Sequence, residues 1–187
     1  LGLDLQGGSY LLLEIDTDPL IKERIQDKVI PLKKLLSSNQ INYDNFSVNP
    51  KSINFIISSD NESKFEALFF SKKDNLLNPY IDQYNSHQLD FEKKENQIII
   101  FFSKFGILSI NNSALNQSIE IVRRRIDDVG TKEPTILQRG DKRILVELPG
   151  LKDPERIKEL LGKTAQLNFR LVSDLSDDFG SEKLISE

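Results

Sequence analysis

The chain has 187 residues, of which 38% are hydrophobic and 29% are charged, as in a globular protein with room for a hydrophobic core. The formal net charge of −4 excludes the strongly basic surface of a nucleic-acid-binding protein. The absence of cysteine excludes disulfides, thiolate nucleophiles and cysteine-based metal sites.

The N-terminal segment places two adjacent glycines, Gly7 and Gly8, directly before an apolar run that predicts a strand over residues 10–15. The chain begins with Leu1 instead of Met, and we expect a fragment or a processed product. Three interpretations of the glycine pair are open: a phosphate-binding loop, a hinge at a domain edge, or an incidental turn. A phosphate loop follows a strand and precedes a helix, which is the reverse of the order here, so this first interpretation is disfavoured.

Apolar spacing predicts the other elements of the first half. Pro31 interrupts the first helical stripe and predicts a kink or a break there. Residues 71–86 carry no readable pattern. The predicted elements are a helix over 19–36, a turn over 47–52 between two strands, a helix over 61–70 capped by Asn61 or Ser63 with Phe65, Leu68 and Phe69 facing inward, and a hairpin over 89–102.

The second half shows a clearer pattern. Gly130 stops an apolar helical stripe, and Asp153-Pro154-Glu155 has the chemistry of a helix start. The predicted elements are a helix over 115–129, strands over 135–138 and 143–148, a helix over 153–162, a strand over 166–172 with Leu167, Phe169 and Leu171 in the core, and a polar tail over 174–187.

This order predicts an α+β fold of two tandem ferredoxin-like (βαββαβ) units, each with an antiparallel sheet covered by helices on one side. The predicted boundaries are residues 1–95 for the first unit, 96–173 for the second unit and 174–187 for a flexible tail. The apolar run over 98–110 contains Lys104 and is too short to be a transmembrane helix, which needs about 20 apolar residues.

Candidate catalytic chemistry is sparse. His87 is the only histidine, and a packed or surface role is favoured over a catalytic one because no nucleophile elbow accompanies it. The run Arg123-Arg124-Arg125 is interpreted as a solvent face with i,i+4 ion pairs to neighbouring acids, or as a protein-contact face. No catalytic residue, metal site or cofactor is expected.

Two stretches, LGLDLQGG with the following strand and the long block from RRRIDDVG to NFRLV, resemble the SecD family of protein-export membrane proteins. In this resemblance the middle of the chain, from about residue 16 to 97, matches only in element order and is expected to be lineage-specific. The residues that carry the match are a first set proposed as a hinge, Leu3, Asp4, Gln6, Gly7 and Gly8, and a second set, Arg124, Gly130, Pro134, Glu147, Pro149 and Gly150.

The resemblance implies the base of the first periplasmic domain of a bacterial inner-membrane subunit, without its head subdomain. Such a subunit is related to resistance-nodulation-division transporters and assists export driven by the proton gradient. The implied partners are SecF, the SecYEG channel, in many bacteria YajC, and unfolded preprotein, with no nucleic acid. The proton-carrying acids belong to membrane helices outside this chain. The alternative is the porter-type domain of a related small-molecule transporter, and a soluble enzyme such as a hydrolase is a distant third.

Overall fold

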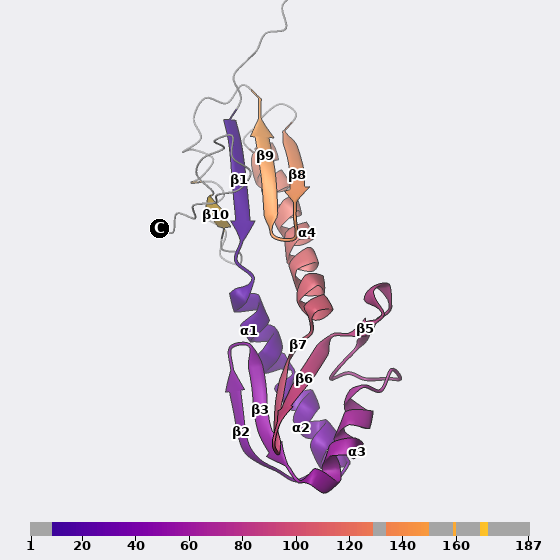
Figure 1. Ribbon diagram of the computed structural model, residues 1–187. Helices are drawn as coiled ribbons and strands as arrows, with labels where there is room; N and C mark the ends of the chain where they lie inside the picture. The colour runs from indigo at the N-terminus through magenta and orange to yellow at the C-terminus, as the bar shows by residue number, and fades with distance from the viewer. Residues whose placement is uncertain (1–8, 129–133, 150–158, 160–168, 172–187) are drawn as a thin grey trace, which may run out of the picture. The chain divides into compact units, whose positions relative to one another are not determined.

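The computed structural model describes residues 9–128, 134–149, 159 and 169–171 (Figure 1). The chain forms two compact units, and one is inserted into the sequence of the other. The split unit comprises Leu1–Thr17 and Asn111–Glu187, and the inserted unit comprises Asp18–Ile110. None of the helices among the described residues is long and apolar enough to cross a membrane.

The sheet of the split unit has four antiparallel strands in the order β10-β1-β9-β8. Leu13 pairs with Ile144 of β9 on one side and with Leu171 of β10 on the other. The first strand of the sequence is therefore central in the sheet. The strands are β1 Ser9–Ile15, β8 Thr135–Arg139, β9 Arg143–Leu148 and β10 Phe169–Leu171.

One face of this sheet packs against the helix α4 (Lys104–Asp128). Alternate side chains of β1 and β9 are buried, as expected for strands with one face in the core. Burial of these aliphatic side chains is the main stabilising contribution of this unit. The buried cluster is Leu11, Leu13, Ile15, Leu115, Val122, Ile126, Ile144, Val146 and Leu148.

The inserted unit has a second four-stranded antiparallel sheet, in the order β2-β3-β7-β6. Its helices are α1 Asp18–Asp27, α2 Val29–Ser38 and α3 Ser59–Phe69. Its strands are β2 Tyr43–Asn49, β3 Ser52–Ile57, β6 Leu89–Lys94 and β7 Gln97–Phe102, with a small pair of β4 Tyr80–Ile81 and β5 Ser86–His87 around a 3-10 turn over Asp82–Tyr84.

The core of the inserted unit is built mainly from one face of β3 and β7 and from α1, α2 and α3, with Leu89 of β6 and Ile110 of α4 added. Ile53, Phe55 and Ile57 of β3 are buried, and they meet the rings of Phe65 and Phe69 from α3. The Phe55 and Phe65 rings lie edge to face, with centroids 5.6 Å apart, which is a favourable arrangement of aromatic pairs. The predicted inward residues of α3 are therefore confirmed.

The predicted helix over 19–36 is two helices, and the break lies at Lys28, before Pro31. Pro31 falls in the first turn of α2, where a helix leaves its backbone N–H groups without intrahelical acceptors and a proline is tolerated. The proline therefore marks the start of the second helix. The predicted caps of α3 are corrected too: the N-cap position is Ser58.

The helix α4 begins at Lys104, well before the predicted start near Leu115. Ser103 explains the start, because its Oγ accepts a hydrogen bond from the backbone N–H of Gly106 at 3.0 Å, as an N-cap does. The apolar run over 98–110 is thereby divided between β7 and α4.

The α+β class with antiparallel sheets is confirmed, whereas the tandem arrangement gives way to an insertion. The predicted boundary between residues 95 and 96 falls inside the β6–β7 hairpin, where Lys94 pairs with Gln97. The boundaries of the compact units lie after residues 17 and 110 instead. The inserted unit opens with two helices and so lacks the βαββαβ order. The predicted helix over 153–162, apart from residue 159, and the tail over 174–187 lie outside the described residues.

Candidate functional site

The first family motif, Leu3, Asp4, Gln6, Gly7 and Gly8, lies outside the described residues, so its hinge role stays a prediction. Gly130 and Gly150 of the second motif lie outside them as well. The others are dispersed: Arg124 is exposed on α4, Pro134 precedes β8, Glu147 lies within β9, and Pro149 follows β9. Leu167 lies outside the described residues, and the core positions of Phe169 and Leu171 stay predictions.

Glu147 belongs to the face of the split unit's sheet opposite α4, which we call the open face. Across β1, β9 and β8 this face carries three rows in register. The middle row is apolar. On one side of it lies a row of polar and aromatic side chains, and on the other side lies a row of charged side chains. The rows are Tyr10–Glu147–Thr135, Leu12–Leu145–Leu137 and Glu14–Arg143–Arg139.

The open face combines exposed apolar side chains with an ion pair. Tyr10 and Leu137 are exposed by 55% and 43%, although both are large apolar side chains. Arg143 Nε lies 3.3 Å from Glu14 Oε2, and both side chains are partly buried. The register of this ion pair depends on strand pairing between distant segments, so the sequence carries no local signal for it.

Two of the three arginines in the run on α4 face solvent, as the solvent-face interpretation predicts, whereas Arg125 is half-buried. Arg123 and Arg124 are exposed. Arg123 pairs with Glu120 at 2.7 Å, three residues before it, instead of with Asp127. An exposed pair of this kind contributes less than about 1 kcal/mol to stability.

His87 is packed between aromatic rings, as the prediction of a packed or surface position allows. Its ring centroid lies 5.3 Å from that of Phe70 and 4.9 Å from that of Tyr80. Its Nε2 is buried, with no hydrogen-bond partner. Within the described ranges there is also no group of three or more acidic or histidine side chains that could hold a metal ion.

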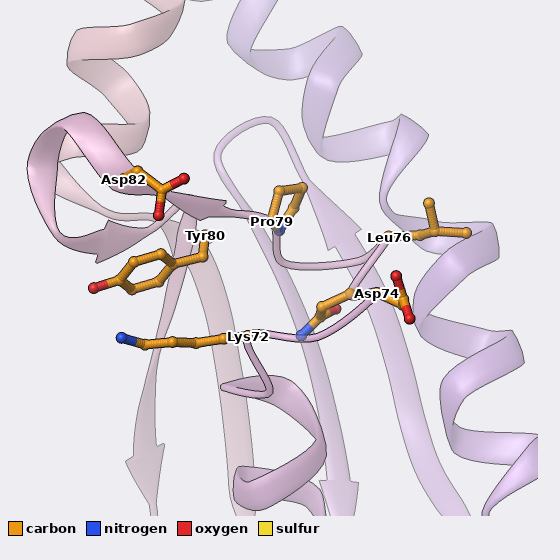
Figure 2. Close-up of a pocket in the computed structure, with 7 residues that line it drawn as sticks. Lys72, Asp74, Leu76, Pro79, Tyr80 and Asp82 are labelled. Carbon is orange, nitrogen blue, oxygen red and sulfur yellow. The ribbon is translucent and has the colours of Figure 1, made fainter.

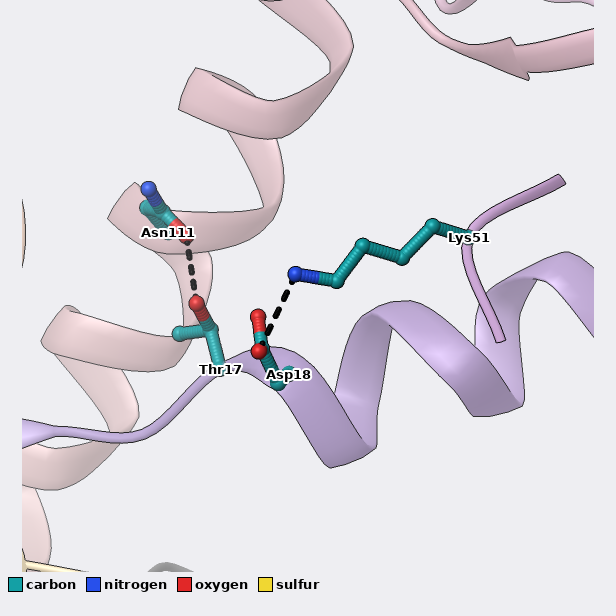
Figure 3. A network of polar contacts seen from close by, with 4 residues as sticks. All are labelled: Thr17, Asp18, Lys51 and Asn111. Atoms are coloured by element: carbon teal, nitrogen blue, oxygen red, sulfur yellow. Dashed lines mark hydrogen bonds and ion pairs between the residues drawn. The ribbon is translucent and has the colours of Figure 1, made fainter. Parts of the chain in front are cut away.

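In the split unit, Thr17 is the last residue before the insertion and Asn111 is the first residue after it, and the two side chains are hydrogen-bonded to each other. Thr17 Oγ1 donates a hydrogen bond to Asn111 Oδ1 at 2.9 Å, and both residues are buried (Figure 3). Asn111 Nδ2 in turn lies 3.2 Å from Asp141 Oδ2, in the β8–β9 turn. In the inserted unit, Lys51 pairs with Asp18 at 3.1 Å, at the first turn of α1.

The segment from 71 to 86, which had no readable pattern, and the two residues after it are held by asparagine side chains. Asn75 Nδ2 donates to the carbonyls of Phe69 and Ser71 at 2.8 and 3.1 Å. Asn78 is fully buried and bonds both the N–H and the carbonyl of Leu89, at 2.6 and 3.1 Å. We call residues 71–88 the asparagine-held loop.

Lys28, at the break between α1 and α2, holds the same loop from the other side. Its Nζ donates to the carbonyl of Leu77 at 2.9 Å and to Gln88 Oε1 at 2.7 Å. The pKa of Lys28 falls from 10.5 to about 8, mainly because the ammonium is buried and also because Arg24 is near, whereas Asp27 acts in the opposite direction. A partly desolvated ammonium therefore fixes the position of the loop.

The outer side of the asparagine-held loop encloses a hollow of about 500 Å³ (Figure 2). The Lys72 side chain runs along the Tyr80 ring, with Nζ 3.9 Å from the ring centroid. Asp74 and Leu76 line it on one side and Asp82 lines it on the other (Figure 2), and Leu76 is 83% exposed.

Comparison with known proteins reveals a family. The model for the N-terminal part of the P1 domain of protein translocase subunit SecDF matches residues 115–174. The SecD subunit of Rickettsia felis is 37% identical over 174 residues, which cover 93% of this chain and 31% of that protein. The SecD subunits of Acetobacter pasteurianus and Desulfurispirillum indicum are 38% and 30% identical over 172 and 178 residues, again covering 92–93% of this chain and 32% of each relative.

These matches define the class as a domain of a protein translocase subunit. The chain carries a P1 domain of the SecD family, and it spans about a third of the length of the curated relatives that it matches. Alignments of this length include most of the inserted unit, so the similarity extends beyond the two stretches that carry the motifs. The expectation that the middle matches only in element order is corrected accordingly.

Proposed function

We propose that the chain is the base of the first periplasmic domain of a SecD subunit, and that it assists export of preproteins by the Sec translocase without catalysing a reaction. The observation that carries this proposal is the similarity to SecD subunits over 93% of the chain. The proposed location of the subunit is the bacterial inner membrane, with this domain on the periplasmic side. The proposed energy source for export is the proton gradient.

The proposed partners are SecF, the SecYEG channel, YajC where it is present, and the emerging preprotein. The open face of the split unit is the surface we assign to such contacts. Its exposed Tyr10 and Leu137 offer apolar contact, and Arg139 and Arg143 offer charge at one end. A surface of this composition suits protein contact better than chemistry on a small substrate.

We further propose that Gly7 and Gly8 form a joint that couples this domain to a preceding membrane helix. Glycine adopts positive φ without the cost that other residues incur, and it allows close approach of the backbone. Replacing both glycines by valine in the full-length subunit should then impair export while the domain stays folded. Normal export in that variant would rule out the joint.

A domain-replacement experiment tests the proposed function. The P1 base of a SecD subunit in a depletion strain is replaced by this chain, and processing of a labelled preprotein is followed with time. The equivalent segment of the Rickettsia felis subunit serves as the positive control. The proposal expects restored processing, which the double substitution Tyr10→Asp and Leu137→Asp on the open face should reduce, whereas Ile30→Asp, an exposed position outside it, should not. Failure of a stably inserted chimera, alongside success of the control, would refute the proposal.

A related small-molecule transporter has less support as the alternative. The relatives that match nearly the whole chain are named as SecD subunits. The hollow beside the asparagine-held loop is open to solvent, whereas pockets for small molecules enclose most of the ligand.

A further inference from the structure

The sheet of the inserted unit, β2-β3-β7-β6, has a second face opposite its three helices, which we call the outer face (Figure 1). We propose that the outer face is the contact site for a segment of another protein that presents apolar side chains flanked by lysine or arginine. This proposal goes beyond the proposed function and stands independently of it.

The first observation is that the helices of the unit cover only one face of the sheet. The buried residues of β3 and β7, such as Phe55 and Ile100, pack with α1, α2 and α3 in one core. Ile56, Ile99 and Phe101 alternate with these buried residues and so belong to the outer face. They are half-buried, and they lie outside both hydrophobic cores of the described residues.

The second observation is the composition of the central strand β7. Its last five residues, Ile98–Phe102, are all apolar. A strand with one face in water alternates apolar and polar residues, whereas a continuous apolar run is typical of a strand that is buried on both faces. The helices of the inserted unit supply the cover for one face. The composition of β7 therefore indicates a second cover from outside the unit.

The third observation is the charge beside these apolar side chains. Each of the three has an exposed acidic residue as its cross-strand neighbour. The pairs are Phe101–Asp90, Ile99–Glu92 and Ile56–Asp44. These carboxylates form no ion pair with any of the described residues. Lys94, in register with Gln97, is the one basic residue in the same three rows, so the outer face carries three carboxylates and one ammonium.

This excess of carboxylates selects the kind of occupant. In a two-fold contact between copies of the chain, the same patch on each copy faces the other. The outer face would then meet an equal excess of negative charge, which is unfavourable. A segment with basic residues beside apolar ones would instead pair with the carboxylates while it covers Ile56, Ile99 and Phe101.

Site-specific crosslinking in the full-length protein, in intact cells, tests the proposal. A photoreactive phenylalanine derivative replaces Gln97, a half-buried polar residue of the outer face. In the matched variant it replaces Val48, an exposed residue on the opposite face of β2, in register with the core residue Ile53. Crosslinked peptides are identified by mass spectrometry. We expect an adduct with one other protein from position 97, absent from position 48, with a lysine or arginine beside apolar residues in the crosslinked peptide.

Charge removal then separates a specific contact from chance proximity. Asp90→Asn with Glu92→Gln removes two carboxylates, and asparagine keeps the Oδ1 that accepts the backbone N–H of Phe91. The control is Asp60→Asn with Glu66→Gln, at exposed acids of α3. The adduct at position 97 should fall about fivefold in the first variant, as for loss of two exposed ion pairs, and should not change in the second.

Four results would overturn the proposal, whatever the export assay shows. They are no adduct at position 97, equal adducts at positions 97 and 48, an adduct that lies within the same polypeptide, and an adduct that survives charge removal.

Discussion

Gly106 is the residue whose replacement tests the packing of the inserted unit most directly. A Cβ atom at this position would lie 2.0 Å from the carbonyl oxygen of Gln88 and 3.3 Å from the Phe102 ring. The Gln88 backbone cannot move away freely. Its N–H donates to Pro79 O at 2.9 Å, and its carbonyl accepts from the N–H of Ser103 at 3.0 Å.

The expected cost of Gly106→Ala follows from these contacts. Alanine in a helix is favoured over glycine by about 1 kcal/mol. Overpacking costs about 1–3 kcal/mol, and loss of the hydrogen bond that Gln88 accepts from Ser103 adds about 1–3 kcal/mol if the donor stays buried. The free energy of unfolding should therefore fall by about 1–5 kcal/mol overall.

Urea denaturation followed by circular dichroism measures this change. Gly140→Ala is the matched control, because Gly140 has a positive φ of 64° but a Cβ atom added there would meet nothing within 4 Å. That variant should lose only the roughly 1–2 kcal/mol associated with the left-handed conformation. An unchanged or increased stability of Gly106→Ala, as at an open helical position, would show that α4 does not pass this closely over Gln88.

Three further predictions concern buried polar groups. The pKa of Lys28 is about 8 in the folded chain and 10.5 when unfolded, so the unfolded state binds more protons between these values. The free energy of unfolding of the wild type should thus rise with pH across this window. The urea midpoint of Lys28→Met should rise less with pH than that of the wild type. Equal slopes of midpoint against pH in the two proteins would contradict burial of the Lys28 ammonium. Asn78→Ala should cost about 2–4 kcal/mol in thermal or urea unfolding, because the backbone groups of Leu89 lose their partners, and a cost below about 0.5 kcal/mol, as at surface positions, would argue against an ordered loop. Thr17→Val leaves Asn111 Oδ1 without its donor and should cost about 1–3 kcal/mol, whereas Thr17→Ser should retain most of the stability.

Local patterns in the sequence were sufficient for the elements that pair with their chain neighbours. The β6–β7 hairpin and the inward residues of α3 follow from alternation and from helical spacing. They could be predicted because period and turn chemistry are read within a few residues.

The insertion could not be predicted in this way. The insertion depends on pairing between distant strands, such as Leu12 of β1 with Leu145 of β9. The alternation of apolar and polar residues within a strand does not say which other strand it pairs with. The asparagine-held loop escaped prediction for a different reason. Asn75 and Asn78 bond backbone groups, and such bonds leave no periodic signal in the sequence.

The placement of β1 has a consequence for the order in which the chain folds. β1 is made first, yet its neighbours β9 and β10 are made last, so it has no strand partner while the inserted unit is synthesised. Thr17 and Asn111 are 94 residues apart, and closing a flexible loop of that length costs about 4 kcal/mol in chain entropy. The inserted unit has its own core, and its strands pair with partners inside the unit. If this unit folds first, the flexible loop between Thr17 and Asn111 becomes a compact domain before the loop closes. Slow completion of the split unit, limited by the return of β9 to β1, is the expected kinetic signature.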